Sequence, residues 1–253
     1  GRGHRDQIQP VRTVALGRNL SFTEALRSER PFLDSRLDGE TYLKNSLRAH
    51  HYREFRRLKR RLADLGTLEY TVARQPDEIR HGVEAFLTLE ASGWKGRERT
   101  AMAIDRYRAA FAREAVHGLA ERDMCRVHTL TLDGKVIACL IVFIENGCAY
   151  TWKTAYDENF STFSPGTLLM IEVTKTHLDD PNILATDSCA VPDHPVMSRI
   201  WSERRTIGTL VIGLTPEADR AARQAAKQLH LYQETRNMAR LLRNRLKALL
   251  GKN

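Results

Sequence analysis

The sequence predicts an α/β (α+β) fold with a mixed central sheet that contains an antiparallel meander and has helices on both faces. Three apolar runs at 125–132, 135–145 and 148–155 are separated by Asp133-Gly134 and Asn146-Gly147. Such dipeptides between apolar runs are the strongest short signals of β-hairpins. Segments with apolar residues at helical spacing stand on both sides of the meander.

The first 66 residues predict an irregular segment followed by a basic helix. Pro10, Gly17, Pro31 and Gly39 interrupt residues 1–40. Leucines and Phe55 recur at helical spacing over 40–65, and Gly66 suits the helix end. The opposite face of this helix is rich in Arg and Lys. That face predicts a solvated surface, a contact to a phosphate-rich partner or a contact to a membrane surface.

A strand and two helices are expected between this helix and the meander. LEYTVA (68–73) alternates as a half-buried strand does, and Pro76-Asp77-Glu78 begins a helix that ends near Ser92-Gly93. GWKGR is then expected to be a loop before a second helix, over about 101–121. The residues expected to face inward on that second helix are Ile104, Tyr107, Phe111, Ala115 and Leu119.

After the meander we expect a helix that begins after Ser164, a strand over 183–191, a short helix near 194–204 and a final strand over 207–214. From Pro216 onward the pattern predicts one long basic helix. These elements divide the chain into an N-terminal segment with its basic helix (1–66), an α/β domain (67–215) and a basic C-terminal helix (216–253).

Composition and charge narrow the classes of protein further. The net charge of +9 is concentrated in residues 44–61 and 220–253, so the rest of the chain is mildly acidic. No apolar run is long enough for a membrane span, and the first thirty residues lack the apolar core of a signal peptide. The four cysteines, all in apolar runs and without CxxC spacing, predict free buried thiols, a cytoplasmic location and no metal site. Because the chain begins with Gly, we expect it to be trimmed or excised from a longer one.

Three phrases carry a family resemblance: FLTLEASGWKG, TWKTAYDENFSTFSPGTLLMIE and DSCAVPDHPVMSRIWSERRTIGTLVIG. They closely resemble the GNAT superfamily of acyltransferases, in its CelD and FemAB-like group. The upstream phrase RPFLDSRLDGETYLKNSLRAHHYREFRRLKRRLADLG is similar to the segment that precedes the domain in that group. The resemblance covers roughly residues 30–215. Longer members of the group carry another GNAT-like half upstream.

The resemblance implies a site for acyl-CoA, acetyl-CoA or a longer thioester, where the fourth and fifth strands of the fold separate. The residues expected to contact it are Thr154, Ser164, Gly166, Thr167 and Leu168. The first turn of a helix offers free N–H groups and a partial positive charge to a diphosphate. This turn departs from the family pattern, because FSTFSPGTL has one glycine and no basic residue. Lys153, Lys175 or an arginine of a flanking helix would have to complete it.

Acyl transfer to an amine needs a base, because a free alkyl amine is protonated at neutral pH. Asp187, His194 and Glu90 are candidate catalytic residues, and Tyr156 is a candidate proton donor to the leaving thiolate. Two alternatives stay open: Asp187 in a hydrogen-bonded structural role, and His194 as the cap of the next helix. The residues expected to contact the acceptor are Trp94, Lys95 and Ser188.

These features predict an N- or O-acyltransferase that moves an acyl group from acyl-CoA to an amine or hydroxyl, on a small molecule or saccharide. The group's association suggests cell-envelope polysaccharide biosynthesis. Two alternatives remain: a FemAB-like aminoacyltransferase that uses aminoacyl-tRNA, and a GNAT-shaped binding module without catalysis. The oligomeric state cannot be read from the sequence.

Overall fold

The computed structural model of the chain describes residues 13–15, 17–18 and 20–250. The chain divides into two compact units. The larger unit is Arg30–Arg205, and the smaller one combines Gly1–Glu29 with Thr206–Asn253. The division of the chain into residues 1–66, 67–215 and 216–253, which was expected from the sequence, stays a prediction.

Among the described residues, seven strands form one sheet in the order β2-β3-β4-β5-β6-β1-β7. The strands are β1 (Phe22–Leu33), β2 (Leu68–Ala73), β3 (Cys125–Leu132), β4 (Lys135–Glu145), β5 (Cys148–Tyr156), β6 (Ala185–Asp187) and β7 (Arg204–Ile212). Strands β2 to β5 pair antiparallel, which confirms the meander, and β5 pairs with β6 in parallel. Both hairpin turns have positive φ at their two central residues, as type I′ turns require.

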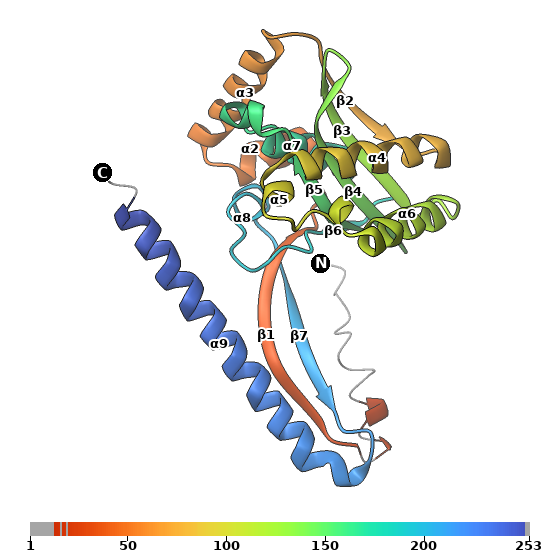
Figure 1. Cartoon of the computed structure of the whole chain (residues 1–253), viewed down its shortest axis with the longest axis vertical. Helices are drawn as coiled ribbons and strands as arrows, with labels where there is room; N and C mark the ends of the chain where they lie inside the picture. Colours follow the sequence, from red (N-terminus) through yellow and green to blue (C-terminus); the bar gives the residue numbers. More distant parts are fainter. Residues whose placement is uncertain (1–12, 16, 19, 251–253) are drawn as a thin grey trace. The chain divides into compact units, whose positions relative to one another are not determined.

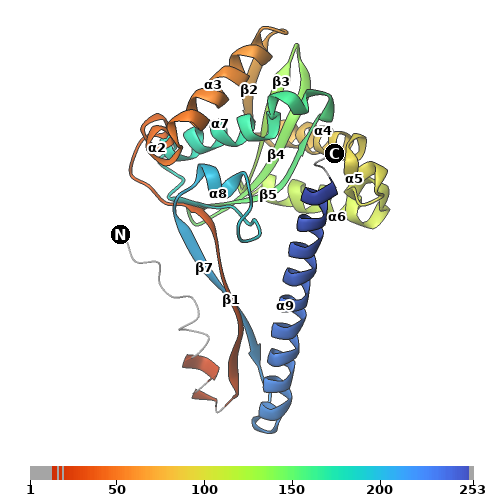
Figure 2. The same ribbon diagram turned by 90° about the vertical axis from the view of Figure 1, so that its left-hand side faces the viewer.

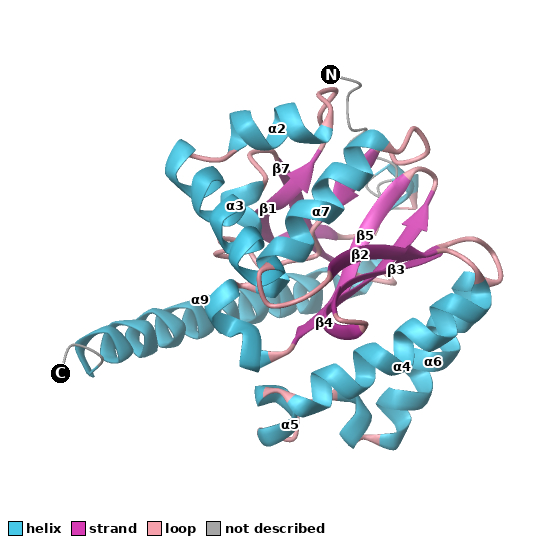
Figure 3. Ribbon diagram, turned by 90° about the horizontal axis from the view of Figure 1, so that it is seen from above, coloured by secondary structure: helices cyan, strands magenta, loops and turns pink. Residues whose placement is uncertain are grey.

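Helices cover both faces of the sheet in the larger unit (Figures 1 and 3). One face carries α2 (Gly39–Ser46), α3 (Ala49–Ala63) and α7 (Pro165–Asp179), and Figure 2 shows α7 running beside α2 and α3. The other face carries α4 (Pro76–Ser92) and α6 (Arg106–Ala120). Each face has its own apolar core, with Leu62, Leu140 and Trp201 in the first and Val83, Phe86 and Ile141 in the second.

The basic helix expected over 40–65 is two helices. The backbone becomes extended at Leu47 and Arg48, which separates α2 from α3. The apolar positions were assigned correctly, because Leu43, Phe55 and Leu62 are buried in the core that contains β4. The arginines of α3 lie on its exposed side, as the pattern predicts.

The predicted inward face of α6 is wrong at its aromatic positions, whereas Leu119 is partly buried against the core as predicted. Tyr107 and Phe111 are 71% and 61% exposed, whereas Ala109, Ala112 and Val116 are buried. Ala112 and Val116 belong to the core shared with α4, and small side chains let two helices approach closely. The predicted start of the helix was also early, since a 3₁₀ turn, η1 (Met102–Ile104), precedes it and Asp105 caps α6 by accepting from the amides of Tyr107 and Arg108.

Several connecting elements differ from the prediction. The segment 1–40 contains β1, and the first twelve residues of the chain lie outside the described residues. GWKGR forms a short helix, α5 (Trp94–Arg97), whose first amide donates to Glu158 Oε1 at 2.7 Å. β6 ends at Asp187, and α8 (Met197–Ile200) is a single turn. A 3₁₀ turn, η2 (Glu158–Phe163), leads into α7.

In the smaller unit, the long basic helix predicted from Pro216 begins with a 3₁₀ turn, η3 (Pro216–Ala218), and continues as α9 (Asp219–Leu250). Ala222 and Ala226 on α9 are buried, while Leu231, Tyr232 and Leu242 are exposed. None of the helices in the described part of the chain combines the length and the apolar character that crossing a bilayer requires.

Candidate functional site

The parallel strands β5 and β6 separate partway along β5. Their register begins at Cys148↔Ala185 and ends at Tyr150↔Asp187, whereas β5 continues to Tyr156 on its pairing with β4. Among the described residues, the edge of β5 over residues 151–156 therefore has no strand partner on the β6 side. Thr151 Oγ1 donates to the carbonyl oxygen of Ser188 at 2.5 Å, just past the point of separation.

The start of α7 lies beside this gap. Ser164 is the N-cap residue, as expected, but it has φ 52° and ψ 53° and its side chain makes no capping hydrogen bond. The amides of Thr167 and Leu168 donate to Ser164 O, and Pro165 has no N–H, so the amide of Gly166 is left for a ligand. A Cβ on Gly166 would lie 3.3 Å from Cδ1 of Tyr156. The absent Cβ thus makes room for the Tyr156 ring.

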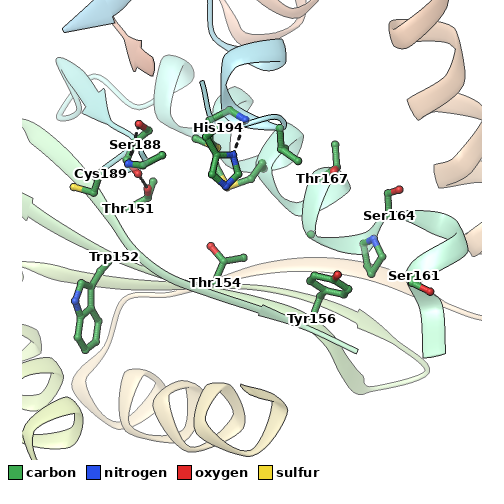
Figure 4. A pocket seen from close by; sticks show the side chains of 16 residues that line it. Thr151, Trp152, Thr154, Tyr156, Ser161, Ser164, Thr167, Ser188, Cys189 and His194 are labelled. Carbon is green, nitrogen blue, oxygen red and sulfur yellow. Dashed lines mark hydrogen bonds between the residues drawn. The ribbon is translucent and has the colours of Figure 1, made fainter. Parts of the chain in front are cut away.

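A cavity of about 420 Å³, here named the α7 cavity, opens between the β5 edge and the start of α7 (Figure 4). Hydroxyl groups dominate its polar lining, and none of the described residues that line it is Lys, Arg, Asp or Glu. Of the predicted site residues, those that line it are Thr154, Tyr156, Ser164, Gly166, Thr167, Ser188 and His194. Five of them come from the junction between β5 and α7 at positions 154–167, which could be recognised from the sequence.

Some predictions for this cavity missed. Leu168 does not line it, because its side chain is 3% exposed in the core. Thr151, Ser161 and Cys189 line it and were not predicted. Thr151 and Ser161 carry hydroxyls close to the predicted junction, which is the signal that could have identified them.

His194 projects into the α7 cavity above Thr154, as Figure 4 shows. Its Nδ1 accepts a hydrogen bond from the Met197 amide at 3.3 Å, and its carbonyl oxygen accepts from the Ser198 amide. The Met197 amide is the first of α8, whose N-cap residue is Val196, so this bond is compatible with the helix-capping alternative, and the role of His194 stays a prediction. Partial burial lowers the pKa of His194, so the ring is neutral at pH 7. With Nδ1 as an acceptor, the proton of the neutral ring is assigned to Nε2, which makes His194 a hydrogen-bond donor toward the cavity.

Asp187 lies outside the α7 cavity lining and is fully buried. Its carboxylate pairs with Arg30, with Oδ1 2.6 Å from Nε and Oδ2 2.6 Å from Nη2, and with Nη1 of Arg205 at 3.4 Å. It also accepts the Cys189 amide at 2.9 Å. With these partners, the geometry favours the structural role for Asp187 over that of a base.

A smaller cavity, the α5 cavity, lies on the other side of the β5 end. It is lined by Glu90, Trp94 and Lys95, and it shares Thr154 and Tyr156 with the α7 cavity. Glu90 is 4% exposed; its Oε1 pairs with Lys95 Nζ at 2.7 Å, and its Oε2 accepts the Met102 amide at 2.9 Å. Trp94 is 47% exposed. A third cavity of about 490 Å³ shares Leu89 and Glu158 with the α5 cavity.

The four cysteines are free, but they are not all buried. Cys125 and Cys139 are buried, and burial raises the pKa of each thiol to about 12. Cys148 is partly buried, and Cys189 is exposed. Although the residue as a whole is exposed, partial burial of its thiol, followed by the charge of Asp187, raises the pKa of Cys189, which makes it a poor nucleophile at neutral pH. Within the residues described, no three His, Cys, Asp or Glu side chains are grouped as metal ligands would be.

A parallel strand pair that separates beside a helix start, next to an antiparallel meander, defines the architecture of a GNAT acyltransferase. Residues 49–180, more than half of the chain, match the acetyltransferase (GNAT) domain family, and the chain belongs to this family. The resemblance predicted from the sequence and the fold class are thereby confirmed. A comparison with curated protein sequences finds no significant match.

Solved structures match the chain at low sequence identity. FemX has a TM-score of 0.54 and 11% identity, with 84% of this chain and 69% of that chain covered. The C-terminal domain (DUF2156) of a protein described as a lysylphosphatidylglycerol synthetase, from Agrobacterium fabrum, has a TM-score of 0.50, 12% identity and coverages of 84% and 68%. A conserved protein of unknown function from Bacteroides thetaiotaomicron has a TM-score of 0.47 and 16% identity, with 72% of this chain and 57% of that chain covered. This chain therefore spans just over half of the length of that protein.

Proposed function

We propose that the chain transfers an acyl group from acyl-CoA to an amine or hydroxyl of a small molecule or saccharide. The observation that carries this proposal is the separation of β5 from β6 after Tyr150↔Asp187, with a cavity of about 420 Å³ in the gap. Acyl-CoA is the donor that GNAT enzymes use. Biosynthesis of a cell-envelope polysaccharide in the cytoplasm is the setting that the family resemblance suggests.

The chemistry of the α7 cavity suits the pantetheine arm of acyl-CoA. The free edge of β5 offers backbone N–H and C=O groups, and an extended amide chain can pair with such an edge as a strand does. Hydroxyls from Thr151, Thr154 and Thr167 add donors and acceptors along the wall. A neutral lining fits this neutral arm, and the diphosphate would lie near the Gly166 amide at the start of α7.

His194 is the residue that we assign to the reacting acyl group. Its Nε2–H is positioned to donate to the acyl carbonyl oxygen, where negative charge develops during attack. This role replaces that of a general base, because the Met197 amide occupies the other ring nitrogen. Tyr156 lines both cavities and is the group proposed to protonate the leaving thiolate. The acceptor would attack as the neutral amine or hydroxyl, and the proton that it loses would restore the Tyr156 hydroxyl.

The acceptor is proposed to enter from the α5 cavity and the adjoining third cavity. Trp94 supplies an exposed ring against which a sugar or an aliphatic chain can pack. Glu90 is held by Lys95 and by the Met102 amide, so its proposed part is to position Lys95 toward an anionic group of the acceptor. Ser188, on the α7 cavity wall, remains a proposed contact to the acceptor.

Titration calorimetry with acetyl-CoA, a longer acyl-CoA and an aminoacyl-tRNA tests the proposal. We expect one acyl-CoA to bind per chain and to stabilise it, by about 2.7 kcal/mol at a hundredfold excess over the dissociation constant. Binding of aminoacyl-tRNA alone would favour the aminoacyltransferase alternative, which the exposed arginines of α3 make chemically reasonable. Thioester binding without thiol release against a panel of amines and sugars would favour a non-catalytic module.

His194→Ala is expected to lower kcat by about 10²-fold with KM for acyl-CoA nearly unchanged, because one donor to the developing oxyanion is lost. Thiol release from acetyl-CoA, followed against pH, measures this. His194→Gln, which can still donate, should retain more activity than the alanine variant. Two results would contradict the donor role. One is a His194→Ala variant with a raised KM and an unchanged kcat. The other is an acid limb in the pH–rate profile of the wild type that His194→Gln removes.

A further inference from the structure

The α7 cavity has no cation of its own for the diphosphate of CoA. Its described lining carries no Lys or Arg, and the start of α7 leaves the single free amide of Gly166. A diphosphate that loses part of its hydration needs charge-assisted hydrogen bonds to replace it. A cationic side chain must therefore reach the start of α7 from another element.

Lys153 and Lys175, the two lysines expected to fill this gap, make other contacts, and so does Lys135. Lys175, near the far end of α7, pairs with Glu40 at 3.2 Å. Lys153 has its Nζ 6.0 Å from the ring centre of Trp152. Lys135 lies 5.9 Å from the ring centre of Phe160 in η2, but its charge is already paired with Asp157 at 2.7 Å. None of these three lysines belongs to the described lining of the α7 cavity.

Arg61 on α3 lies where the cation is needed. Its guanidinium carbon is 5.7 Å from the ring centre of Phe163, the residue that immediately precedes Ser164. α3 packs against η2, which keeps this arginine close to the start of α7. Arg61 is exposed, and within the described part of the chain no carboxylate lies at ion-pair distance from it.

We infer that Arg61, stacked on Phe163, supplies the cation that binds the diphosphate of the acyl-CoA donor. A guanidinium over an aromatic ring is held in orientation, and its planar fork matches two phosphate oxygens at once. The chain thereby obtains from its upstream helix the charge that most relatives carry in the turn itself. This inference rests on the proposed function, because it names a residue for the same donor site.

Calorimetric titration with CoA, dephospho-CoA and pantetheine tests the inference in wild type, Arg61→Ala and Arg60→Ala. Pantetheine lacks the diphosphate, and dephospho-CoA keeps it without the 3′-phosphate. We expect Arg61→Ala to weaken CoA and dephospho-CoA by about tenfold or more and pantetheine by less than twofold. Arg60→Ala, an equal charge loss at the neighbouring exposed position of α3, should leave all three within about twofold.

Arg61→Lys should recover part of the lost affinity, since lysine keeps the charge but not the fork. Equal losses in Arg61→Ala and Arg60→Ala would overturn the inference, because they would indicate a general field of the helix. An Arg61→Ala variant that binds CoA as tightly as the wild type does would also overturn the inference. If the wild type binds neither CoA nor dephospho-CoA, the proposed function fails and this inference fails with it.

Discussion

Asp187→Ala is expected to lower the free energy of unfolding by about 3 kcal/mol, because it leaves the charges of Arg30 and Arg205 without their buried carboxylate. Asp187 is fully buried, and the side chains of the two arginines are only 23% and 19% exposed. The variant would also lose the acceptor of the Cys189 amide, which shapes the turn after β6. Denaturation in urea, with the slope compared to wild type, measures the change.

Glu84→Ala is the matched control for this experiment. Glu84 makes two hydrogen bonds to Arg113, but the side chains are 51% and 42% exposed, so we expect a change below about 1 kcal/mol. If Asp187 were instead the catalytic base, Asp187→Ala would keep wild-type stability within about 1 kcal/mol and lose about 10²-fold or more in kcat. That result would contradict the structural role.

Lowering the pH from 7 to 4 is expected to destabilise the protein by roughly 3 kcal/mol through His177. Burial lowers the pKa of His177 from 6.5 to about 4 in the folded state. The unfolded chain therefore takes up the proton first as the pH falls. This contribution to stability is present in full above pH 6.5, is lost between pH 6.5 and about 4, and does not change further below that.

His177 belongs to a buried polar chain that crosses the larger unit. Its Nδ1 is 2.9 Å from Thr186 Oγ1, and its Nε2 is 3.4 Å from Nε2 of His128, whose Nδ1 is 2.8 Å from the Tyr70 hydroxyl. Burial, followed by the charge of His177, lowers the pKa of His128 well below 6.5, so His128 adds a loss of the same sign. Two charged residues near His177 also act on its pKa: Asp180 raises it, and Arg74 lowers it.

His177→Gln should flatten the dependence of stability on pH between 6.5 and 4, whatever its effect on the free energy of unfolding at pH 7. NMR titration of the native protein gives an independent reading, with the His177 ring expected to stay neutral at pH 5. A ring that titrates near pH 6.5 in the folded protein, or a variant with the full wild-type slope, would contradict this account of acid sensitivity.

The local elements of the fold could be predicted from the sequence, and the long-range ones could not. The meander was readable because Asp133-Gly134 and Asn146-Gly147 determine their turns by local backbone conformation. β1 was missed because Pro31 interrupts its pattern and because β6, with which it pairs through Phe32 and Leu33, lies more than 150 residues away. The α6 face was misassigned because aromatic side chains give a stronger hydrophobic signal than the alanines that are buried.

The candidate site likewise has a local part that could be predicted from the sequence and long-range contacts that could not. The junction at 154–167 was recognisable, because a strand end, a loop and a helix start are adjacent in sequence. The partners of Asp187 were not, since Arg30 is 157 residues distant and only the folded chain brings the two together. The place of Arg61 beside Phe163 depends on the packing of α3 against η2, which no local pattern specifies.

Hydrogen–deuterium exchange with and without CoA tests the central claim, that the gap between β5 and β6 holds the acyl donor. The account predicts slower exchange in peptides that cover residues 151–156 and 161–168, with little change in β2 and β3. Bound CoA that protects other peptides and leaves these two at their unliganded rates would contradict it.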